Sequence, residues 1–274
     1  MSNISVKKLF LKQLLLKLEK LKFITAGFSR IIYLIFSVEN IWLHAGKMHD
    51  NLAHKHFAIQ LTLSLEEPFE VHFGNKHISA HSVLIKNNVE HSLQSNNELL
   101  IMLFNPVSTF GHYLTEILDN QDWMVYEAGW LSELQPLSGL FFKNEITGKK
   151  FLEAAAGKIA DFKCTCEIEN HYSDERIHRA IQYLEEHSHE IVPVEEIASV
   201  CSLSEGRFIH LFKEKTGITY RRFQLWNKLL HAGKCIIAGM NMTDSAHEAG
   251  FADSAHFSRT FKETFGALPK NILS

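Results

Sequence analysis

Residues 203–217, LSEGRFIHLFKEKTG, and residues 251–266, FADSAHFSRTFKETFG, carry the same pattern, F-x-x-x-F-K-E-x-x-G. Two phenylalanines four positions apart lie on one face of a helix, and a glycine just past the last turn is typical of a helix C-terminus. The pattern therefore predicts one short amphipathic helix that is built twice. The phenylalanines expected to face a core are Phe208, Phe212, Phe257 and Phe261.

A second helix is expected ahead of each repeat. Before the first repeat, Pro193 suits a first helical turn, and Glu195 and Glu196 follow where the helix dipole favours acids. A turn then leads to Ser204, a suitable N-cap for the repeated helix. Two helices joined by a short turn form a helix-turn-helix motif, whose second helix can enter the major groove of DNA. The first motif is predicted at 194–217.

The second motif is predicted at 243–266. Thr243 and Asp244 are expected to cap its first helix, residues 250–253 to form the turn, and residues 254–265 to form its second helix. Between the motifs, FQLWNKLLHAGKCIIAG (223–239) has apolar residues at helical spacing and predicts a rigid connecting helix. Neighbouring major-groove segments on one side of a duplex lie roughly 34 Å apart. Two motifs on one chain could therefore contact both segments without a dimer.

With the phenylalanines turned inward, the outer faces of the repeated helices become candidate DNA-contacting surfaces. Arg259 is the strongest candidate for a base contact, because its planar fork matches guanine O6 and N7. The other basic residues are expected to contact phosphates, which position a protein without specifying sequence. The alternatives are a phosphate contact or an internal salt bridge for Arg259 and plain solvation for the other charges. The candidate DNA-binding residues are Glu205, Gly206, Ile209, His210, Lys213, Arg221, Arg222, Ser254, Ala255, Ser258, Arg259 and Lys262.

Length and composition agree with this interpretation but do not decide it. The 274 residues predict two domains, and 46% hydrophobic with 22% charged residues is typical of globular proteins. A net charge of −3 gives no general nucleic-acid footprint, but residues 204–222 hold five basic groups against two acidic ones. The cysteines lack C-x-x-C spacing and are interpreted as reduced thiols of a cytoplasmic protein. They are Cys164, Cys166, Cys201 and Cys235.

The N-terminal part has a different character. Residues 1–38 form a basic amphipathic segment that could dock on the protein or lie on a membrane surface. Short apolar or alternating runs between residues 39 and 104 predict the strands of a sandwich or small barrel. Helices follow, and one of them, at 150–163, has an apolar face that predicts a dimer contact. Residues 164–173 are polar and aperiodic, and we interpret them as a linker to an all-helical domain at 174–274.

Residues 174–274 resemble the DNA-binding domain of the AraC/XylS family of transcription regulators. The resemblance rests on EEIASVCSLSEGRFIHLFKEKTGITYRRF, LWNKLLHAG and AHEAGFADSAHFSRTFKETFGALP. Two residues depart from the family pattern, since Lys228 replaces a usual arginine and Ser245 a larger aliphatic residue. In the family, DNA is contacted at the positions that are here Gly206, Ile209, His210, Ser254, Ala255, Ser258 and Arg259.

The resemblance also implies that residues 39–163 form a cupin-like domain for effector sensing and dimerisation. The residues that resemble cupin motifs are Gly46, His54, Lys55, His56, Gln60 and His91. Gln60 stands where a glutamate is usual. We assign His54, His56, Gln60 and His91 to an effector pocket, with no metal ion and no cofactor. A metal site and purely structural histidines are the alternatives.

The expected fold is α+β with two domains, an N-terminal cupin-like β-barrel with helices and a C-terminal all-α bundle with two helix-turn-helix motifs. The expected function is sequence-specific DNA binding in transcription regulation, controlled by an unidentified small-molecule effector. Double-stranded DNA, a second copy of the chain and, for an activator, RNA polymerase are the implied partners. The alternatives are a metal-dependent cupin enzyme with a regulatory tail and a membrane-associated regulator. We expect no enzyme, because we find no nucleophile–base pair, phosphate loop or paired carboxylates.

Overall fold

The computed structural model describes residues 31–34, 41–47, 51–64, 66–127, 129–143, 145–146, 150–151, 154, 174–187 and 191–273. Three predictions fall outside these ranges for all or most of their length. They are the basic amphipathic segment, the dimer-contact helix and the linker at 164–173. Among the described helices, none has both the length and the hydropathy that crossing a bilayer requires.

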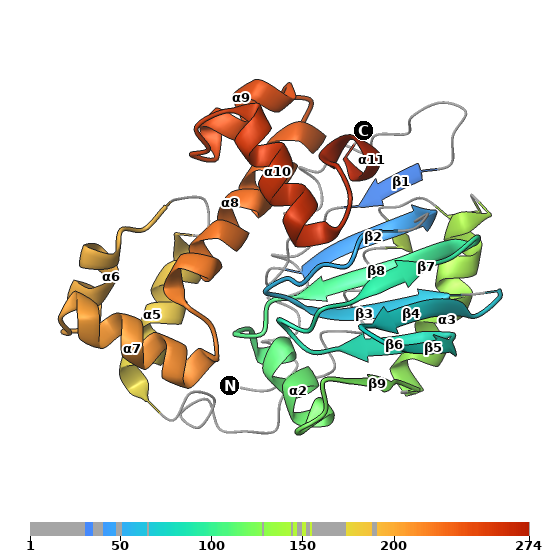
Figure 1. The fold of residues 1–274 in the computed structure, drawn as a ribbon, viewed down its shortest axis with the longest axis horizontal. Coiled ribbons are helices and arrows are strands. Elements are labelled where there is room, and N and C mark those ends of the chain that lie inside the picture. The colour runs from blue at the N-terminus through green and yellow to red at the C-terminus, as the bar shows by residue number, and fades with distance from the viewer. Residues whose placement is uncertain are drawn as a thin grey trace.

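The N-terminal half contains two antiparallel sheets (Figure 1). The larger sheet has, in spatial order, β1 (Ile31–Leu34), β2 (Ile41–Lys47), β8 (Glu98–Phe104), β3 (Ile59–Ser64), β6 (Ser82–Ile85) and β9 (Trp123–Val125). The smaller sheet has, in order, β5 (Lys76–Ala80), β4 (Phe69–Phe73) and β7 (Ser92–Gln94). The prediction of strands between 39 and 104 is confirmed. Residues 31–34, which we had placed in the amphipathic segment, instead pair with β2.

The pairing of the described strands does not close a barrel. The larger sheet runs from β1 at one edge to β9 at the other, and the smaller sheet packs on one of its faces. The prediction of an α+β chain is therefore confirmed, whereas the closed barrel is not found among the described strands. The regular spacing of strands in the sequence is equally compatible with two packed sheets, because both arrangements bury alternate side chains.

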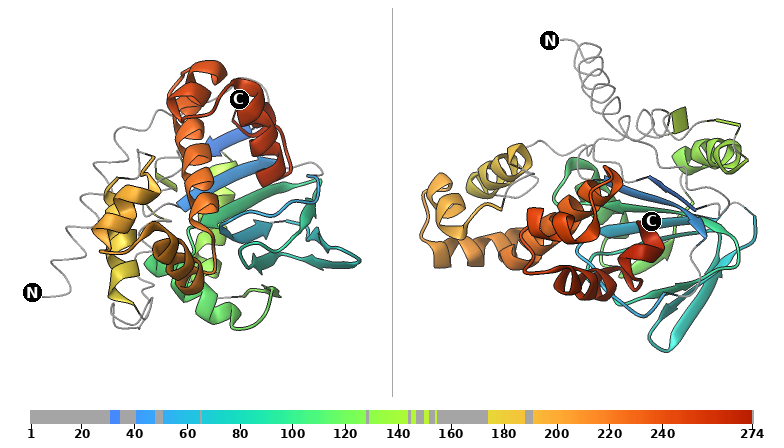
Figure 2. Two further views of the ribbon diagram at one scale, coloured as in Figure 1. Left: turned by 60° about the vertical axis from the view of Figure 1, so that its left-hand side comes forward. Right: turned by 90° about the horizontal axis from the view of Figure 1, so that it is seen from above.

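Both faces of the larger sheet are buried. On one face, Leu61, Leu84 and Met102 lie side by side across three strands and pack on α2 (Thr109–Leu118) and α3 (Gly129–Phe142). The opposite face belongs to a second core, which also holds the smaller sheet and the C-terminal helices. This explains why β3 and β8 are apolar along almost their whole length, as strands covered on both sides are. Figure 2 shows α3 and the C-terminal helices on different sides of the sheet.

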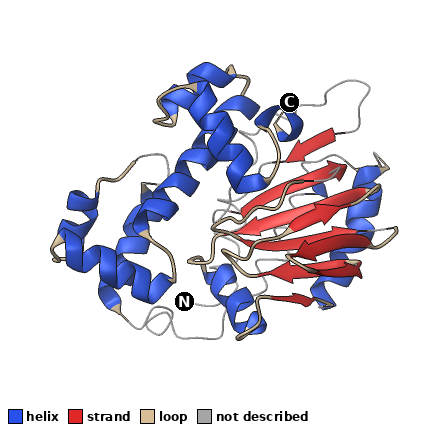
Figure 3. Ribbon diagram, viewed as in Figure 1, coloured by secondary structure: helices blue, strands red, loops and turns tan. Residues whose placement is uncertain are grey.

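The C-terminal half is entirely helical in its described residues (Figure 3). Its helices are α5 (Glu175–Glu186), α6 (Val194–Val200), α7 (Glu205–Thr216), α8 (Tyr220–Ile237), α9 (Met242–Glu248), α10 (Ser254–Phe265) and α11 (Pro269–Ile272). The two repeats form α7 and α10, as predicted. The four repeat phenylalanines are fully buried, which confirms that they face a core. Gly217 and Gly266 end the two helices in the left-handed conformation, with φ of 72° and 70°.

One predicted cap is wrong. The N-cap of α9 is Asn241, whose side-chain oxygen accepts the backbone N–H of Asp244 at 2.9 Å. Thr243 and Asp244 lie inside the first turn instead. Asp244 still stabilises the N-terminus of α9. Its carboxylate accepts a hydrogen bond from the Asn241 side chain, and a negative charge is favourable near a helix N-terminus.

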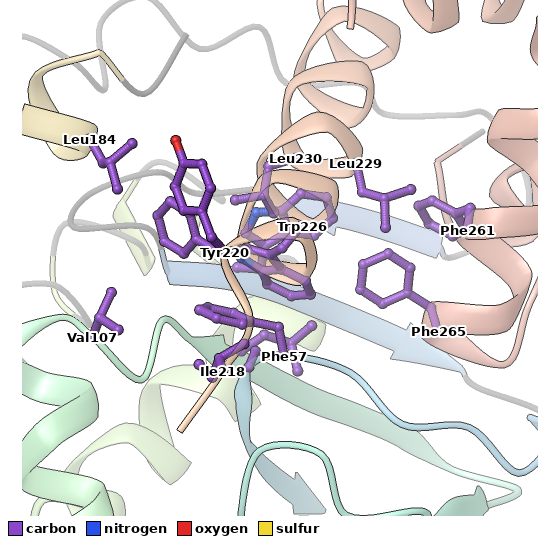
Figure 4. Packing of buried hydrophobic residues seen from close by; sticks show 14 of the residues in the cluster. Phe57, Val107, Leu184, Ile218, Tyr220, Trp226, Leu229, Leu230, Phe261 and Phe265 are labelled. Carbon is purple, nitrogen blue, oxygen red and sulfur yellow. The ribbon is translucent and has the colours of Figure 1, made fainter. Parts of the chain in front are cut away.

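The sheet and the helices share aromatic contacts. Trp42 of β2 stacks on Phe265 of α10 with ring centroids 5.7 Å apart, and it lies 6.0 Å from Trp226 of α8. Phe57, just before β3, contacts Phe223 and Trp226 of α8 at 5.6 and 5.9 Å. Figure 4 shows Phe57, Trp226 and Phe265 directed toward one another between the helices and the sheet. Helices α8 and α10 are therefore packed directly on the N-terminal half.

Gly217 and Gly266 allow a matched test of this packing. A Cβ at position 217 would meet no atom within 4 Å, whereas a Cβ at 266 would lie 2.5 Å from the Leu52 carbonyl oxygen and 2.7 Å from Nδ1 of His54. We expect Gly217→Ala to lower the free energy of unfolding by about 1–2 kcal/mol, the strain of a left-handed alanine. Gly266→Ala should lower it by a further ~1–3 kcal/mol, because the loop at Leu52 must move. Urea denaturation of the full chain would measure both, and equal losses would contradict the close packing at Gly266.

Candidate functional site

The outer face of α7 is available to a partner. All five residues predicted there are exposed, and Gly206 has open space beside it. Ile209 is 42% exposed. The helix is fixed by the Ser204 side chain, which accepts the backbone N–H of Arg207, as the N-cap prediction requires. The predicted residues are Glu205, Gly206, Ile209, His210 and Lys213.

Arg207 of α7 is also exposed, although it is not among the predicted residues. Its position one turn after the N-cap Ser204 was the available signal, since residues in the first turn of a recognition helix are the ones that lie nearest base edges.

The outer face of α10 is also exposed, although less completely. Ala255, Arg259 and Lys262 are exposed, whereas Ser254 and Ser258 are half-buried. The Ser258 hydroxyl lies 3.5 Å from the sulfur of Met242 in α9, so this side chain also contacts its own motif.

The start of α10 is held by an acidic N-cap. The Asp253 carboxylate accepts the backbone N–H of His256 at 2.6 Å. This hydrogen bond lowers the pKa of Asp253, and the nearby Arg259 and His256 lower it further. The carboxylate is therefore charged at neutral pH and caps the first turn, and Arg259 follows in the second turn of the helix.

The two motifs lie at opposite ends of α8 (Figure 1). This helix has 18 residues, which corresponds to about 27 Å at 1.5 Å per residue. Thr219 caps it, so it begins earlier than predicted. Lys228, one of the two departures from the family pattern, donates a hydrogen bond to the carbonyl of Gly250 at 3.0 Å and holds the turn of the second motif against α8. Ser245, the other departure, is fully buried.

Arg221 and Arg222 are exposed at the start of α8, but Arg222 has a partner within the chain. Its Nη1 donates to Oδ1 of Asn88 at 2.8 Å. Asn88 belongs to the N-terminal half and adopts a positive φ of 63°. A residue predicted to contact phosphate is therefore bound to the N-terminal half in this structure.

The four residues assigned to an effector pocket lie together between the two halves. His54, His56 and His91 offer one ring nitrogen each within 4.8 Å of one another, and all three are buried. Gln60 of β3 joins them, with its Oε1 2.9 Å from Nε2 of His56 and 3.3 Å from Nε2 of His91. His54 and His56 precede β3 instead of lying in a strand, and His54 pairs with His91 through an isolated β-bridge.

The histidines are neutral at neutral pH. Burial, followed by the nearby His56 ring, lowers the pKa of His54 to about 3. Burial also lowers the pKa of His56, and burial together with the other two rings holds the pKa of His91 well below its ordinary value. Each ring therefore keeps one unprotonated nitrogen with an available lone pair.

A small cavity adjoins the histidines. Its volume of about 40 Å³ is room for a few water molecules. The N-terminal half contributes Trp42, His54, His56 and Gln60 to its lining, and the C-terminal half contributes Phe261, Phe265 and Ile272. The cavity is therefore lined by both halves of the chain, and α10 forms part of its wall.

Comparison with known proteins identifies the helical half. A family described as "Helix-turn-helix domain" matches residues 197–274. The chain is 34% identical over 101 residues to the HTH-type transcriptional activator RhaS of Enterobacter sp. (strain 638), and 29% identical over 99 residues to an HTH-type transcriptional regulator of Staphylococcus aureus. Residues 197–274 therefore contain a helix-turn-helix domain like those of HTH-type transcriptional regulators. The matches cover 36% of the chain, 36% of RhaS and 13% of the Staphylococcus protein.

A likeness in fold extends beyond the helical half. Crystal structures of ToxT from Vibrio cholerae align with 87% and 86% of this chain and with 99% and 98% of theirs, at TM-scores of 0.54 and 0.53. The sequence identity is 14% in both cases, so the likeness concerns the fold. ToxT therefore shares the overall fold of this chain, an N-terminal sheet region followed by a helical region.

Proposed function

We propose that this chain is a sequence-specific DNA-binding regulator of transcription. The observation that carries the proposal is the pair of recognition helices, α7 and α10, at the two ends of one helix, each with an exposed outer face and a buried phenylalanine face. A separation set by a helix of about 27 Å suits two neighbouring major-groove segments, which lie roughly 34 Å apart. The relationship to RhaS supports the same function.

Within this function, α10 has the stronger means of reading sequence. Arg259 is exposed beside the ordered first turn and has a guanidinium that can bind guanine through two hydrogen bonds. On α7, Ile209 suits apolar contact with a thymine methyl group, and Arg207 adds a donor. Lys213, Arg221, Arg222 and Lys262 are assigned to phosphates, which attract the protein without distinguishing bases.

The N-terminal half is proposed to bind a small-molecule effector in the cavity between the halves. The cavity supports this because α10 forms part of its wall, so an occupant would contact a recognition helix directly. Among the structural neighbours, ToxT has been solved with an unsaturated fatty acid bound and with a naphthalenyl butenoic acid bound. We further propose a homodimer as the functional unit and, if the protein is an activator, a contact with RNA polymerase.

The regulator is favoured over the metal-dependent enzyme. The relatives that match are transcriptional regulators, and the histidine cluster lies beside α10, with the His56 ring 6.5 Å from that of Phe265. A metal ion there would act on the position of the helices, and no catalytic role is proposed.

Replacing Arg259 should reduce specificity. We expect Arg259→Ala to lower the preference for the selected site over random DNA by about 1–3 kcal/mol, because a bidentate base contact is lost. Lys262→Ala should lower the affinity for the specific duplex and for random DNA by similar factors, since a phosphate contact carries no sequence information. Sites selected from a random DNA library would supply the specific duplex, and anisotropy titrations would measure affinity. An unchanged preference for the specific duplex in Arg259→Ala would show that Arg259 makes no base contact. If the wild-type chain binds no DNA at all, the proposed function as a regulator is wrong.

Releasing Arg222 should strengthen DNA binding. Glycine tolerates the positive φ of residue 88, so Asn88→Gly removes the acceptor of Arg222 without backbone strain. Since a net hydrogen bond contributes about 0.5–1.5 kcal/mol, we expect up to about tenfold tighter binding to specific and random DNA alike. Asn88→Asp is the matched control, because its charge should hold Arg222 more firmly and weaken binding. Equal affinities for wild type, Asn88→Gly and Asn88→Asp would show that Arg222 does not contact DNA.

A further inference from the structure

We propose that His54, His56, His91 and Gln60 form a binding site for a divalent transition-metal ion of the Zn²⁺ type, and that the ion holds the loop at residues 51–56 against the end of α10. This goes beyond the proposed function, because it concerns metal binding and not DNA. The first observation is the convergence of three buried imidazoles whose ligand nitrogens lie within 4.8 Å of one another. Imidazole is a common ligand of such ions.

The ring orientations are those of metal ligands. Each histidine makes the same contact with its own backbone neighbourhood, Nδ1 to a carbonyl oxygen two residues away, at 2.9 Å in all three cases. A carbonyl oxygen can only accept, so each Nδ1 carries the proton and each Nε2 is an unprotonated base. Metal-binding histidines are typically fixed in this way, with the other ring nitrogen donating to a carbonyl. The carbonyls belong to Leu52, Ala58 and Val89.

Gln60 completes the set of donors. Its amide nitrogen donates to Oγ1 of Thr62 at 3.0 Å, which directs Oε1 toward Nε2 of His56 and Nε2 of His91. With these nitrogens unprotonated, an oxygen and the ring nitrogens face one another with lone pairs and no hydrogen between them. A cation at their centre would bind all of them, and three nitrogens with one oxygen give the four ligands that Zn²⁺ prefers.

The competing arrangement needs no ion. If the Gln60 amide is turned around, its nitrogen donates to the two rings and its oxygen accepts from the Thr62 hydroxyl, since amide oxygen and nitrogen are assigned from their hydrogen bonds. The two arrangements differ in one measurable respect, because only the first binds metal.

The site is joined to α10 by direct contacts. The backbone N–H of Leu52 donates to the carbonyl of Gly266 at 3.1 Å, two residues from His54. A Cβ at Gly266 would lie 2.7 Å from the His54 ring, and the His56 ring lies 6.5 Å from that of Phe265. An ion that fixes His54 and His56 would therefore also fix the surface on which the C-terminal end of α10 rests.

The test is metal titration of the full chain after treatment with a chelator. We expect one Co²⁺ per chain, with the visible absorption of tetrahedral cobalt, and displacement by Zn²⁺. His91→Gln should weaken binding at least about 100-fold, because a direct ligand is lost. His77→Gln, which changes an exposed histidine of the smaller sheet, should leave affinity unchanged. No tetrahedral spectrum for the wild type, or unchanged affinity in His91→Gln, would overturn the site in favour of the turned amide.

Two further measurements keep the proposal testable if His91→Gln does not fold. Gln60→Glu should bind the ion at least about tenfold more tightly, because a carboxylate adds charge to the donor set. Equal or weaker binding would overturn the assignment of Gln60 as a ligand.

Hydrogen exchange of the Leu52 amide should slow on metal loading of the wild-type chain, and an unchanged rate would overturn the link to Gly266. None of these measurements involves DNA, so their failure is separate from that of the proposed regulator.

Discussion

The contact between Trp42, Trp226 and Phe265 is the interaction on which the arrangement of the whole chain depends. These three rings come from β2, α8 and α10 and lie within 6.0 Å of one another, centroid to centroid. Aromatic side chains of this size bury large apolar areas. Because one core includes both the sheet and the helices, the recognition helices cannot change their position without disturbing packing around the sheet.

This shared core explains why the proposed functions meet at one place. The cavity, the histidine cluster and the end of α10 are all formed at the boundary between sheet and helices. A ligand there could alter the balance between arrangements of α10 only if it binds one of them more strongly. Two hydrogen bonds join the halves near this place, from Arg222 to Asn88 and from Leu52 to Gly266. A movement of the helices relative to the sheet would have to break them.

The helical half could be predicted from the sequence because its signals are local. The i, i+4 phenylalanines, the N-cap Ser204 and the two C-terminal glycines each act within a few residues, and all were confirmed. The cap of α9 was missed because Asn241, Thr243 and Asp244 offer three capping side chains within four residues. The pairing of β1 and the bond between Arg222 and Asn88 depend on residues distant in sequence. The histidines could be grouped by their spacing in the sequence. Which ring nitrogen of each is unprotonated could not be predicted, because it depends on the contacts of Nδ1 with backbone carbonyls in the folded chain.

Gly266 combines several requirements in one residue. It ends α10 with a positive φ, its carbonyl accepts the Leu52 N–H, and its missing side chain leaves room for the His54 ring. Gly217 ends α7 in the same conformation with open space around it. Sequence drift should therefore affect the two positions differently in descendants of this chain. Substitutions at 217 can be accepted singly, whereas those at 266 should covary with changes in the segment 51–54.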